Sequence, residues 1–152
     1  MRLTTKGRFA VTALLDVALR SSDGPVNLAA VSERQQISLS YLEQLFGKLR
    51  RNGLVDSVRG PGGGYVIARE LDTISVAHIV IAVDEPLDAR QCEGKQDCLN
   101  GKQCMTHDLW HNLNEKMLEY LESVSLLDLV TQQLAAEAPK QHTIEMPKRV
   151  AH

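Results

Sequence analysis

Residues 37–65 read ISLSYLEQLFGKLRRNGLVDSVRGPGGGY, and this stretch contains the pattern that decides the fold. Its first half repeats large apolar residues at i, i+3, i+4 and i+7, a spacing that places them on one face of an α-helix. These residues are Leu42, Leu45, Phe46 and Leu49. The spacing therefore predicts an amphipathic helix whose opposite face is polar.

Both ends of this helix carry capping residues. Ser38 or Ser40 can accept the first backbone amides, and Ser40-x-x-Glu43 has the form of a capping box. Asn52-Gly53 follows the last apolar residue, and both residue types tolerate the left-handed backbone of a C-terminal cap. The Glu43 carboxylate thus has two competing roles, as part of this cap or as a group that contacts a partner.

A β-hairpin is predicted directly after the helix. Residues 54–59 and 65–68 are β-prone, and Gly60-Pro61-Gly62-Gly63-Gly64 separates them. The glycine run is not a nucleotide cradle, because it lacks the Lys-Ser/Thr of a P-loop and does not match G-x-G-x-x-G. We expect a hairpin with a flexible glycine tip.

Two further helices are predicted upstream. Residues 8–20 carry an apolar stripe at helical spacing that ends before the Asp23-Gly24-Pro25 turn. The stripe consists of Phe9, Ala13, Leu14, Val17 and Ala18. A short helix should follow over residues 28–35, with Asn27 as its N-terminal cap.

Three helices followed by a hairpin is the element order of a winged helix-turn-helix. We predict such a domain for residues 1–83, with a connecting helix at 75–83 capped by Ser75. The fold class is therefore mainly α with a small β-hairpin wing, to which a long dimerisation helix is appended.

That long helix is predicted to begin after Thr106. Its apolar residues recur at spacings of three, four, four and three, which is a seam of heptad type. They are Trp110, Leu113, Met117, Leu121 and Val124. Because the short first domain has little surface left to cover them, we expect residues 107–136 to be dimerisation helices of a homodimer. The tail, 137–152, lacks a pattern and is expected to be disordered.

Residues 84–106 have no periodicity and contain all three cysteines of the chain, in CEGKQDCLNGKQCMTH. Cys92, Cys98, Cys104 and His107 form a C-x5-C-x5-C-x2-H pattern. An odd number of clustered cysteines next to a histidine indicates metal ligation more than disulfide formation. We therefore predict a metal-binding loop.

Thiolates suit zinc, copper(I) and iron–sulfur clusters, whereas calcium and magnesium require oxygen ligands. Structural zinc sites usually pair cysteines at C-x2–4-C, and the gaps here are wider. A Cys3His zinc site and an iron–sulfur cluster both stay open on spacing alone. His111, one turn after His107, could replace it as a ligand, whereas His78 is expected to be a core or surface histidine. No cysteine is marked as a nucleophile, so an enzyme is the least supported class.

Charge is distributed unevenly along the chain. Residues 1–70 carry ten Lys/Arg against six Asp/Glu, whereas residues 71–152 carry seven against thirteen. A basic first half indicates that the winged helix meets a polyanion. No apolar run approaches the ~18 residues of a membrane span. The N-terminus also lacks a cleavage site, so we expect a cytoplasmic protein.

The polar face of the third helix and the wing supply candidate DNA contacts. Glutamine suits adenine and glutamate can accept a hydrogen bond from cytosine, so Gln44 and Glu43 are candidate base readers. Arginine favours a narrow minor groove, which Arg59 could enter from the wing tip. The full set of candidates is Lys6, Arg8, Ser40, Tyr41, Glu43, Gln44, Lys48, Arg59 and Gly60.

Three motifs together resemble the Rrf-type winged-helix transcription regulators. They are MRLTTKGRFAVTALLDVA, ISLSYLEQLFGKLRRNGLVDSVRGPGGGY and the C-x5-C-x5-C-x2-H pattern, and the resemblance covers about residues 1–133. It implies a homodimer that binds a [2Fe-2S] cluster through Cys92, Cys98, Cys104 and His107. It also implies control of genes for iron–sulfur cluster assembly, with the assembly machinery as the source of the cluster.

The same resemblance places Ser40, Glu43, Gln44 and Arg59 at positions matching the family's DNA contacts. Dimer symmetry predicts a palindromic or pseudo-palindromic site in double-stranded DNA. Family members that sense nitric oxide or iron have similar cysteine spacing and remain an alternative. A zinc-containing regulator and an electron carrier or cluster-transfer protein are the other readings that the sequence leaves open.

Overall fold

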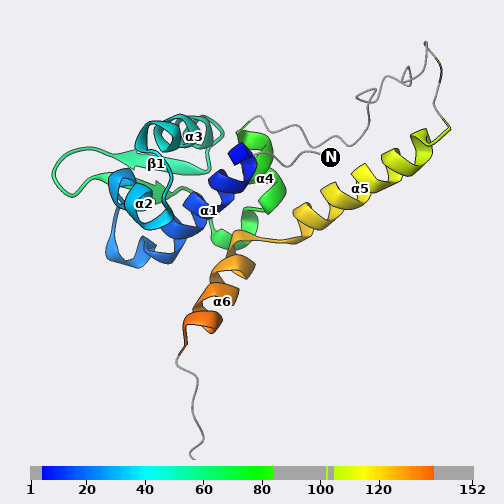
Figure 1. The fold of residues 1–152 in the computed structure, drawn as a ribbon. Helices are drawn as coiled ribbons and strands as arrows, with labels where there is room; N and C mark the ends of the chain where they lie inside the picture. Colours follow the sequence, from blue (N-terminus) through cyan, green and yellow to red (C-terminus); the bar gives the residue numbers. More distant parts are fainter. Residues whose placement is uncertain (1–4, 84–101, 103–104, 139–152) are drawn as a thin grey trace, which may run out of the picture.

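The computed structural model describes residues 5–83, 102 and 105–138. Helices dominate it, and the two strands form one antiparallel hairpin (Figure 1). The elements in chain order are α1 (Thr5–Leu19), η1 (Ser21–Asp23), α2 (Leu28–Gln35), α3 (Leu39–Arg51), β1 (Val55–Val58), β2 (Gly64–Ile67), η2 (Leu71–Thr73), α4 (Val76–Ala82), α5 (His107–Ser123) and α6 (Leu126–Glu137). The predicted fold class is confirmed, and the predicted bounds of α2 are those observed.

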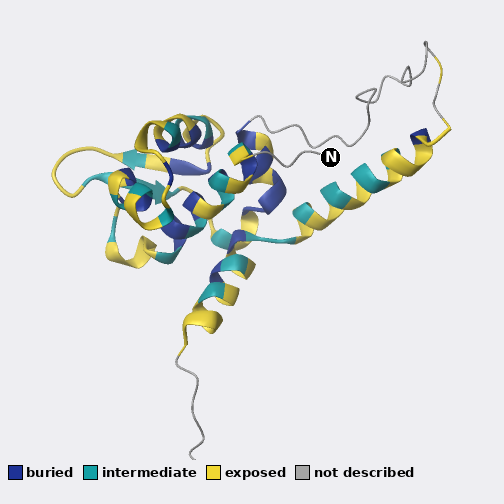
Figure 2. Ribbon diagram, viewed as in Figure 1, coloured by how far each residue is buried: buried dark blue, intermediate teal, exposed yellow. Residues whose placement is uncertain are grey.

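One buried core unites α1, α2, α3, the hairpin and α4 (Figure 2). The apolar stripe of α1 lies inside it, since Ala13, Leu14 and Val17 have no exposed surface. The predicted face of α3 meets the same core, with Leu42, Phe46 and Leu49 fully buried. The apolar periodicity of the sequence therefore identified the inward faces of both helices.

The caps of α2 and α3 are each formed by one side chain. The Asn27 Oδ1 atom accepts a hydrogen bond from the Ala29 amide at 2.7 Å, as predicted. Ser38 Oγ accepts from the Tyr41 amide at 3.2 Å, which makes Ser38 the cap of α3. The capping box predicted for Ser40 and Glu43 is wrong, because α3 already begins at Leu39.

A local reason explains why α3 starts at the earlier serine. Ile37 and Leu42 occupy the positions that flank a helix start in a hydrophobic staple, and both are buried. Their burial fixes the direction in which the chain enters the helix. Ser38 is then in the extended conformation of an N-cap, with φ −61° and ψ 140°.

The hairpin has the predicted glycine tip between β1 and β2. Val55 pairs with Ile67, and Val58 pairs with Gly64. Gly60 has φ +98°, a conformation that residues with a side chain rarely adopt. A Cβ atom on Gly63 would lie 2.3 Å from the Val58 carbonyl oxygen, so the turn also needs glycine for space.

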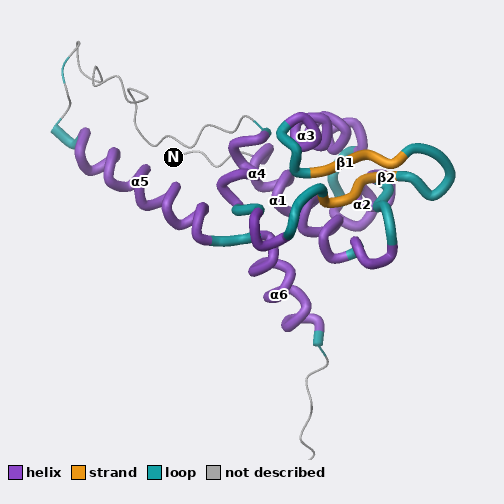
Figure 3. Tube along the Cα trace, turned by 180° about the vertical axis from the view of Figure 1, so that it is seen from behind, coloured by secondary structure: helices purple, strands orange, loops and turns teal. Residues whose placement is uncertain are grey.

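Backbone hydrogen bonds join the start of α4 to the start of α6. The Val76 amide donates to Val124 O at 2.9 Å, and the Leu126 amide donates to Ile74 O at 2.7 Å. Leu126 and Val130 of α6 are thereby buried in the core. Figure 3 shows α5 and α6 leaving the body in different directions.

The long helix α5 differs from all the others in its exposure. Leu109, Trp110 and Tyr120 are exposed, although they are large and apolar or aromatic. Within α5, which the structure describes completely, His107 is the one buried residue. None of the described helices is long and apolar enough to cross a membrane. The predictions for 84–101, 103–104 and 139–152 concern residues outside the described ranges.

Candidate functional site

The outward face of α3 presents the polar residues that the sequence singled out. Ser40, Glu43 and Gln44 are exposed, whereas Tyr41 and Lys48 are half-buried. Because Ser38 caps the helix, the Glu43 carboxylate is not part of a capping box and projects from a regular helical turn. Of the two roles considered for Glu43, the capping role is therefore wrong, and contact with a partner stays a prediction.

Aromatic contacts hold α3 against its neighbours. The ring of Tyr41 meets the ring of Phe9 edge-on, with centroids 6.0 Å apart and an interplanar angle of 77°. The ring of Phe46 lies 5.0 Å from that of Tyr65 in β2. The first contact brings the beginnings of α1 and α3 together, and the second ties α3 to the wing.

The other candidate DNA contacts lie on α1 and the hairpin. Arg8 is exposed near the beginning of α1, and Lys6 is half-buried there. Arg59 and Gly60 are exposed at the tip of the hairpin. Phe9 contacts Tyr41, so the start of α1, which carries Arg8, lies next to the first turn of α3.

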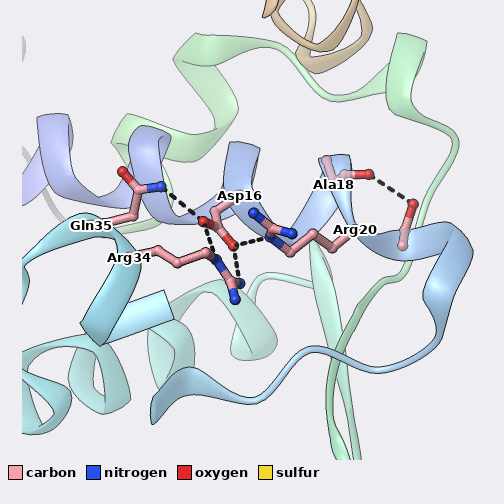
Figure 4. Close-up of polar contacts among 6 residues, drawn as sticks. Asp16, Ala18, Arg20, Arg34 and Gln35 are labelled. Carbon is pink, nitrogen blue, oxygen red and sulfur yellow. Dashed lines mark hydrogen bonds and ion pairs between the residues drawn. The ribbon is translucent and has the colours of Figure 1, made fainter. Parts of the chain in front are cut away.

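A buried ionic cluster locks α2 onto α1, the helix that supports α3 (Figure 4). Asp16 of α1 has a side chain only 3% exposed and accepts hydrogen bonds from Arg34 at 2.5 and 3.0 Å. Gln35 donates to the same carboxylate at 2.8 Å, and Arg20 lies 3.6 Å from it. This two-oxygen Arg–carboxylate pairing fixes both distance and orientation between the two helices.

The charge state of Asp16 follows from these contacts. Burial raises the pKa of its carboxyl, but hydrogen bonds from Arg34 and Gln35 and the charges of Arg34 and Arg20 outweigh that effect. The pKa of Asp16 therefore lies below its ordinary value. Asp16 is therefore ionised at neutral pH.

A groove of about 410 Å³ separates the first turn of α3 from the base of the wing. The start of α2 closes a third side. Its lining residues are Asn27, Leu28, Ala29, Leu39, Glu43, Gly63, Gly64 and Tyr65. The groove thus lies between the two elements predicted to enter DNA.

Of the four predicted metal ligands, the structure describes His107, while Cys92, Cys98 and Cys104 lie outside the described residues. His107 is the first residue of α5 and is only 6% exposed. Its ring is stacked on that of His111, with centroids 6.4 Å apart and planes within 8° of parallel. The described residues alone contain no group of three side chains that could hold a metal ion.

Two other predictions about this end of the chain can be compared with the structure. Thr106 precedes α5 as predicted, but its hydroxyl accepts a hydrogen bond from the Trp110 indole at 3.0 Å instead of capping a backbone amide. His78 closes a capping box with Ser75, because its Nδ1 atom accepts from the Ser75 amide at 3.2 Å. His78 is therefore a surface capping residue.

Comparison with known proteins places this geometry in a family. Residues 3–132 match Rrf2, described as "Iron-dependent Transcriptional regulator". The chain belongs to the Rrf2 family.

Two curated relatives share the name HTH-type transcriptional regulator IscR. The HTH-type transcriptional regulator IscR of Erwinia tasmaniensis is 54% identical, in an alignment that covers all of this chain and 92% of that protein. IscR of Xenorhabdus nematophila is 60% identical over 88% of this chain and 81% of its own length. Like these relatives, the chain is an HTH-type transcription regulator.

Solved structures agree with that assignment. IscR of T. potens has a TM-score of 0.76 and 36% identity, with 92% of this chain and 93% of that one covered. CymR, the global cysteine regulator of B. subtilis, has a TM-score of 0.75 and 31% identity over 87% of this chain and 98% of its own. The winged helix-turn-helix fold of the Rrf2 family is therefore confirmed.

Two features of the Rrf2 body escaped sequence reasoning. The Asp16–Arg34–Gln35 cluster joins residues eighteen and nineteen positions apart. The sequence does contain a signal for this cluster, because Asp16 is a lone carboxylate inside the apolar stripe of residues 8–20. A charge buried at such a position requires a partner. No sequence signal predicts the groove beside Leu39, because the groove depends on how α2, α3 and the wing pack against one another.

Proposed function

We propose that this chain is a homodimeric, iron–sulfur-cluster-sensing transcription regulator that controls genes of cluster assembly. Cys92, Cys98, Cys104 and His107 would hold a [2Fe-2S] cluster supplied by the assembly machinery. The observation that carries the proposal is the buried His107 at the start of α5, two residues after Met105 and three after Cys104. It connects the predicted ligand loop directly to the predicted dimer helix.

The donor set fits such a group. Three thiolates and one imidazole are soft and borderline ligands, which bind iron–sulfur clusters and zinc well. Imidazole ligation of a two-iron cluster is chemically established in Rieske centres, where histidines replace cysteines on one iron. When bound, the cluster would supply a centre that draws residues 92–107 together. Protonation of imidazole competes with metal binding, so occupancy should be sensitive to pH.

The exposed apolar face of α5 supports the homodimer. Leu113, Met117 and Leu121 recur at heptad spacing and are only half-buried in one chain. A second copy would cover them and place two winged helices in symmetric positions. Such symmetry matches a palindromic operator whose half-sites lie about one helical turn apart or a multiple of that.

Base reading and positioning would then be divided between elements. Ser40, Glu43 and Gln44 on the exposed face of α3 would contact base edges, with Tyr41 alongside. Arg59 would enter the minor groove from the wing tip, next to Gly60. Lys6, Arg8 and Lys48 would contact phosphates, which gives affinity and register without sequence information.

The first test is metal and sulfide content with a visible spectrum, on untagged protein purified without oxygen. About two irons and two sulfides per chain, without zinc, are expected for a Cys3His-ligated two-iron cluster. One zinc per chain and no colour would overturn the sensor mechanism and leave a zinc-containing regulator.

Trp110 offers a second readout for the same site. It is the single tryptophan of the chain and lies one helical turn after His107. Its fluorescence should be quenched when the protein carries a cluster and recover when iron is chelated. His107→Cys should lengthen the lifetime of the cluster, because thiolate is a stronger ligand for iron than imidazole. An unchanged lifetime would contradict the role given to His107.

Binding of duplex DNA as a function of salt separates a regulator from an electron carrier. Several phosphate contacts per dimer predict a steep, linear fall of the logarithm of affinity with the logarithm of salt concentration. An electron carrier or cluster-transfer protein would show no such dependence.

A further inference from the structure

Leu39 departs from the burial pattern of its own helix. It precedes Leu42 by three residues and Phe46 by seven, so helical periodicity places it on the apolar face of α3. Leu42 and Phe46 are fully buried, yet Leu39 is 40% exposed. Leu39 is therefore only partly covered by the body, although its neighbours on the same helical face are enclosed.

Folding of the helix start does not account for this leucine. Ile37 and Leu42 occupy the two positions of a hydrophobic staple and are both buried, and Ser38 supplies the cap. Neither the cap nor the staple uses the Leu39 side chain. An apolar side chain at this half-exposed position is therefore available for contact with a partner.

The surroundings of Leu39 indicate what it contacts. Leu39 lines the groove between α3 and the wing, together with Glu43 one turn further along the same helix. Gly63 and Gly64 face them from the wing and contribute no side chain, so the groove stays open. Leu39 thus borders a space enclosed by the two elements that would enter DNA.

Double-stranded DNA presents one apolar group in its major groove, the C5 methyl of thymine. The first residues of a recognition helix are those that contact base edges. Leu39 is the first residue of α3, and its neighbours Ser40 and Glu43 are polar groups suited to hydrogen bonds with adjacent bases. An apolar side chain at this position matches the methyl group and none of the polar base edges.

We propose that Leu39 is a specificity-determining residue that contacts the C5 methyl of a thymine in each operator half-site. The inference rests on the proposed DNA-binding function and adds a thymine preference that none of the polar candidate residues explains. The expected contribution is that of burying one methyl group, which corresponds to about a fourfold gain in affinity per half-site.

The test compares thymine with deoxyuridine, which has the same hydrogen-bonding groups and lacks only the methyl. A duplex is first selected by the full-length protein from a randomised pool, and its affinity is measured at several salt concentrations. Each thymine of one half-site is then replaced by deoxyuridine in turn. Every duplex is titrated with wild type, Leu39→Ala, Leu39→Met and the control Leu134→Ala, an exposed leucine in α6.

One thymine position is expected at which loss of the methyl weakens wild-type binding about fourfold. At that position Leu39→Ala should show less than a twofold difference between the two bases. Leu39→Met, which keeps an apolar side chain, and Leu134→Ala should retain the wild-type difference.

Two results would overturn the proposal. One is a wild-type protein that is insensitive to every methyl, a result that needs no variant to fold. The other is a methyl effect that persists unchanged in Leu39→Ala. Failure to select any duplex with salt-dependent affinity would instead contradict the proposed DNA-binding function itself.

Discussion

The body of this protein and its long helix α5 bury their apolar side chains in different ways. In the body, the inward faces of α1 and α3 are fully buried, and even α6 contributes Leu126 and Val130 to the same core. In α5, by contrast, Leu109, Trp110 and Tyr120 are exposed, and the heptad residues are only half-buried (Figure 2).

This contrast separates the body, whose apolar faces are buried within one chain, from α5, whose apolar face is not. Helices in proteins derive most of their stability from packing of an apolar face, and a 17-residue helix such as α5 is marginal in isolation. The body satisfies that condition by itself. The apolar face of α5 would satisfy it if a second chain covered that face, which is the physical basis of the proposed homodimer.

The sharpest test of the contrast is aromatic truncation in each region. Phe46→Ala removes a ring that is fully buried and packed against Tyr65, and it should lower the free energy of unfolding by about 3–5 kcal/mol. Tyr120→Ala in α5 removes a ring that is 67% exposed and should change it by less than about 0.5 kcal/mol. Urea denaturation followed by circular dichroism measures both. Similar losses for the two variants would contradict the division into a packed body and an uncovered helix.

Placing a charge on the heptad face of α5 should disrupt dimer formation without unfolding the body. Leu113→Glu is expected to leave the thermal midpoint of the body nearly unchanged and to halve the mass measured by sedimentation. Because a dimer binds two half-sites at once, affinity for a palindromic duplex should fall about a hundredfold or more. Glu115→Gln, at an exposed position of the same helix, is the control. A Leu113→Glu protein with an unchanged mass would remove α5 as the dimer element.

Within the body, Asp16→Asn tests the cluster that joins α1 to α2. Losing charge-assisted hydrogen bonds from Arg34 should cost about 2 kcal/mol at neutral pH. The exposed Asp23→Asn is the matched control.

The pH dependence of that difference has a defined sign. The pKa of Asp16 is lower in the folded state than the ~3.9 of an unfolded chain. Its stabilisation is therefore complete above that unfolded value and is lost as the pH falls through the folded one. The difference in the free energy of unfolding between wild type and Asp16→Asn should stay constant from about pH 5 to about pH 8 and narrow below about pH 4. A gap that widens on acidification would contradict the assignment.

The smallest expected effect distinguishes the two serines at the start of α3. Ser38→Ala removes the observed cap and should cost about 1 kcal/mol of stability. Ser40→Ala should leave stability nearly unchanged, because Ser40 is inside the helix, and should weaken DNA binding instead. Thermal denaturation measures the stability of both variants, and a binding titration measures their affinity for DNA. A loss of stability in Ser40→Ala but not in Ser38→Ala would contradict the assignment of Ser38 as the cap.

Short-range chemistry by itself determined much of this protein. The cap at Asn27, the inward face of α3, the glycine tip of the hairpin and the start of α5 after Thr106 all follow from residues within four positions of one another. Helical periodicity and turn preferences act over that distance, so the sequence predicts them. The four candidate metal ligands stay a prediction, which rests on their clustering between Cys92 and His107.

The tertiary structure decided what depends on elements meeting. It chose Ser38 over Ser40 because Ile37 and Leu42 had to be buried together, and it paired Asp16 with Arg34 across eighteen residues. It also left Leu39 partly exposed, although its periodicity matches that of the core, because Leu39 lines the open groove between α2, α3 and the wing. Packing of α1, α2, α3 and the wing sets these outcomes, and packing is a property of the assembled chain that no local pattern encodes.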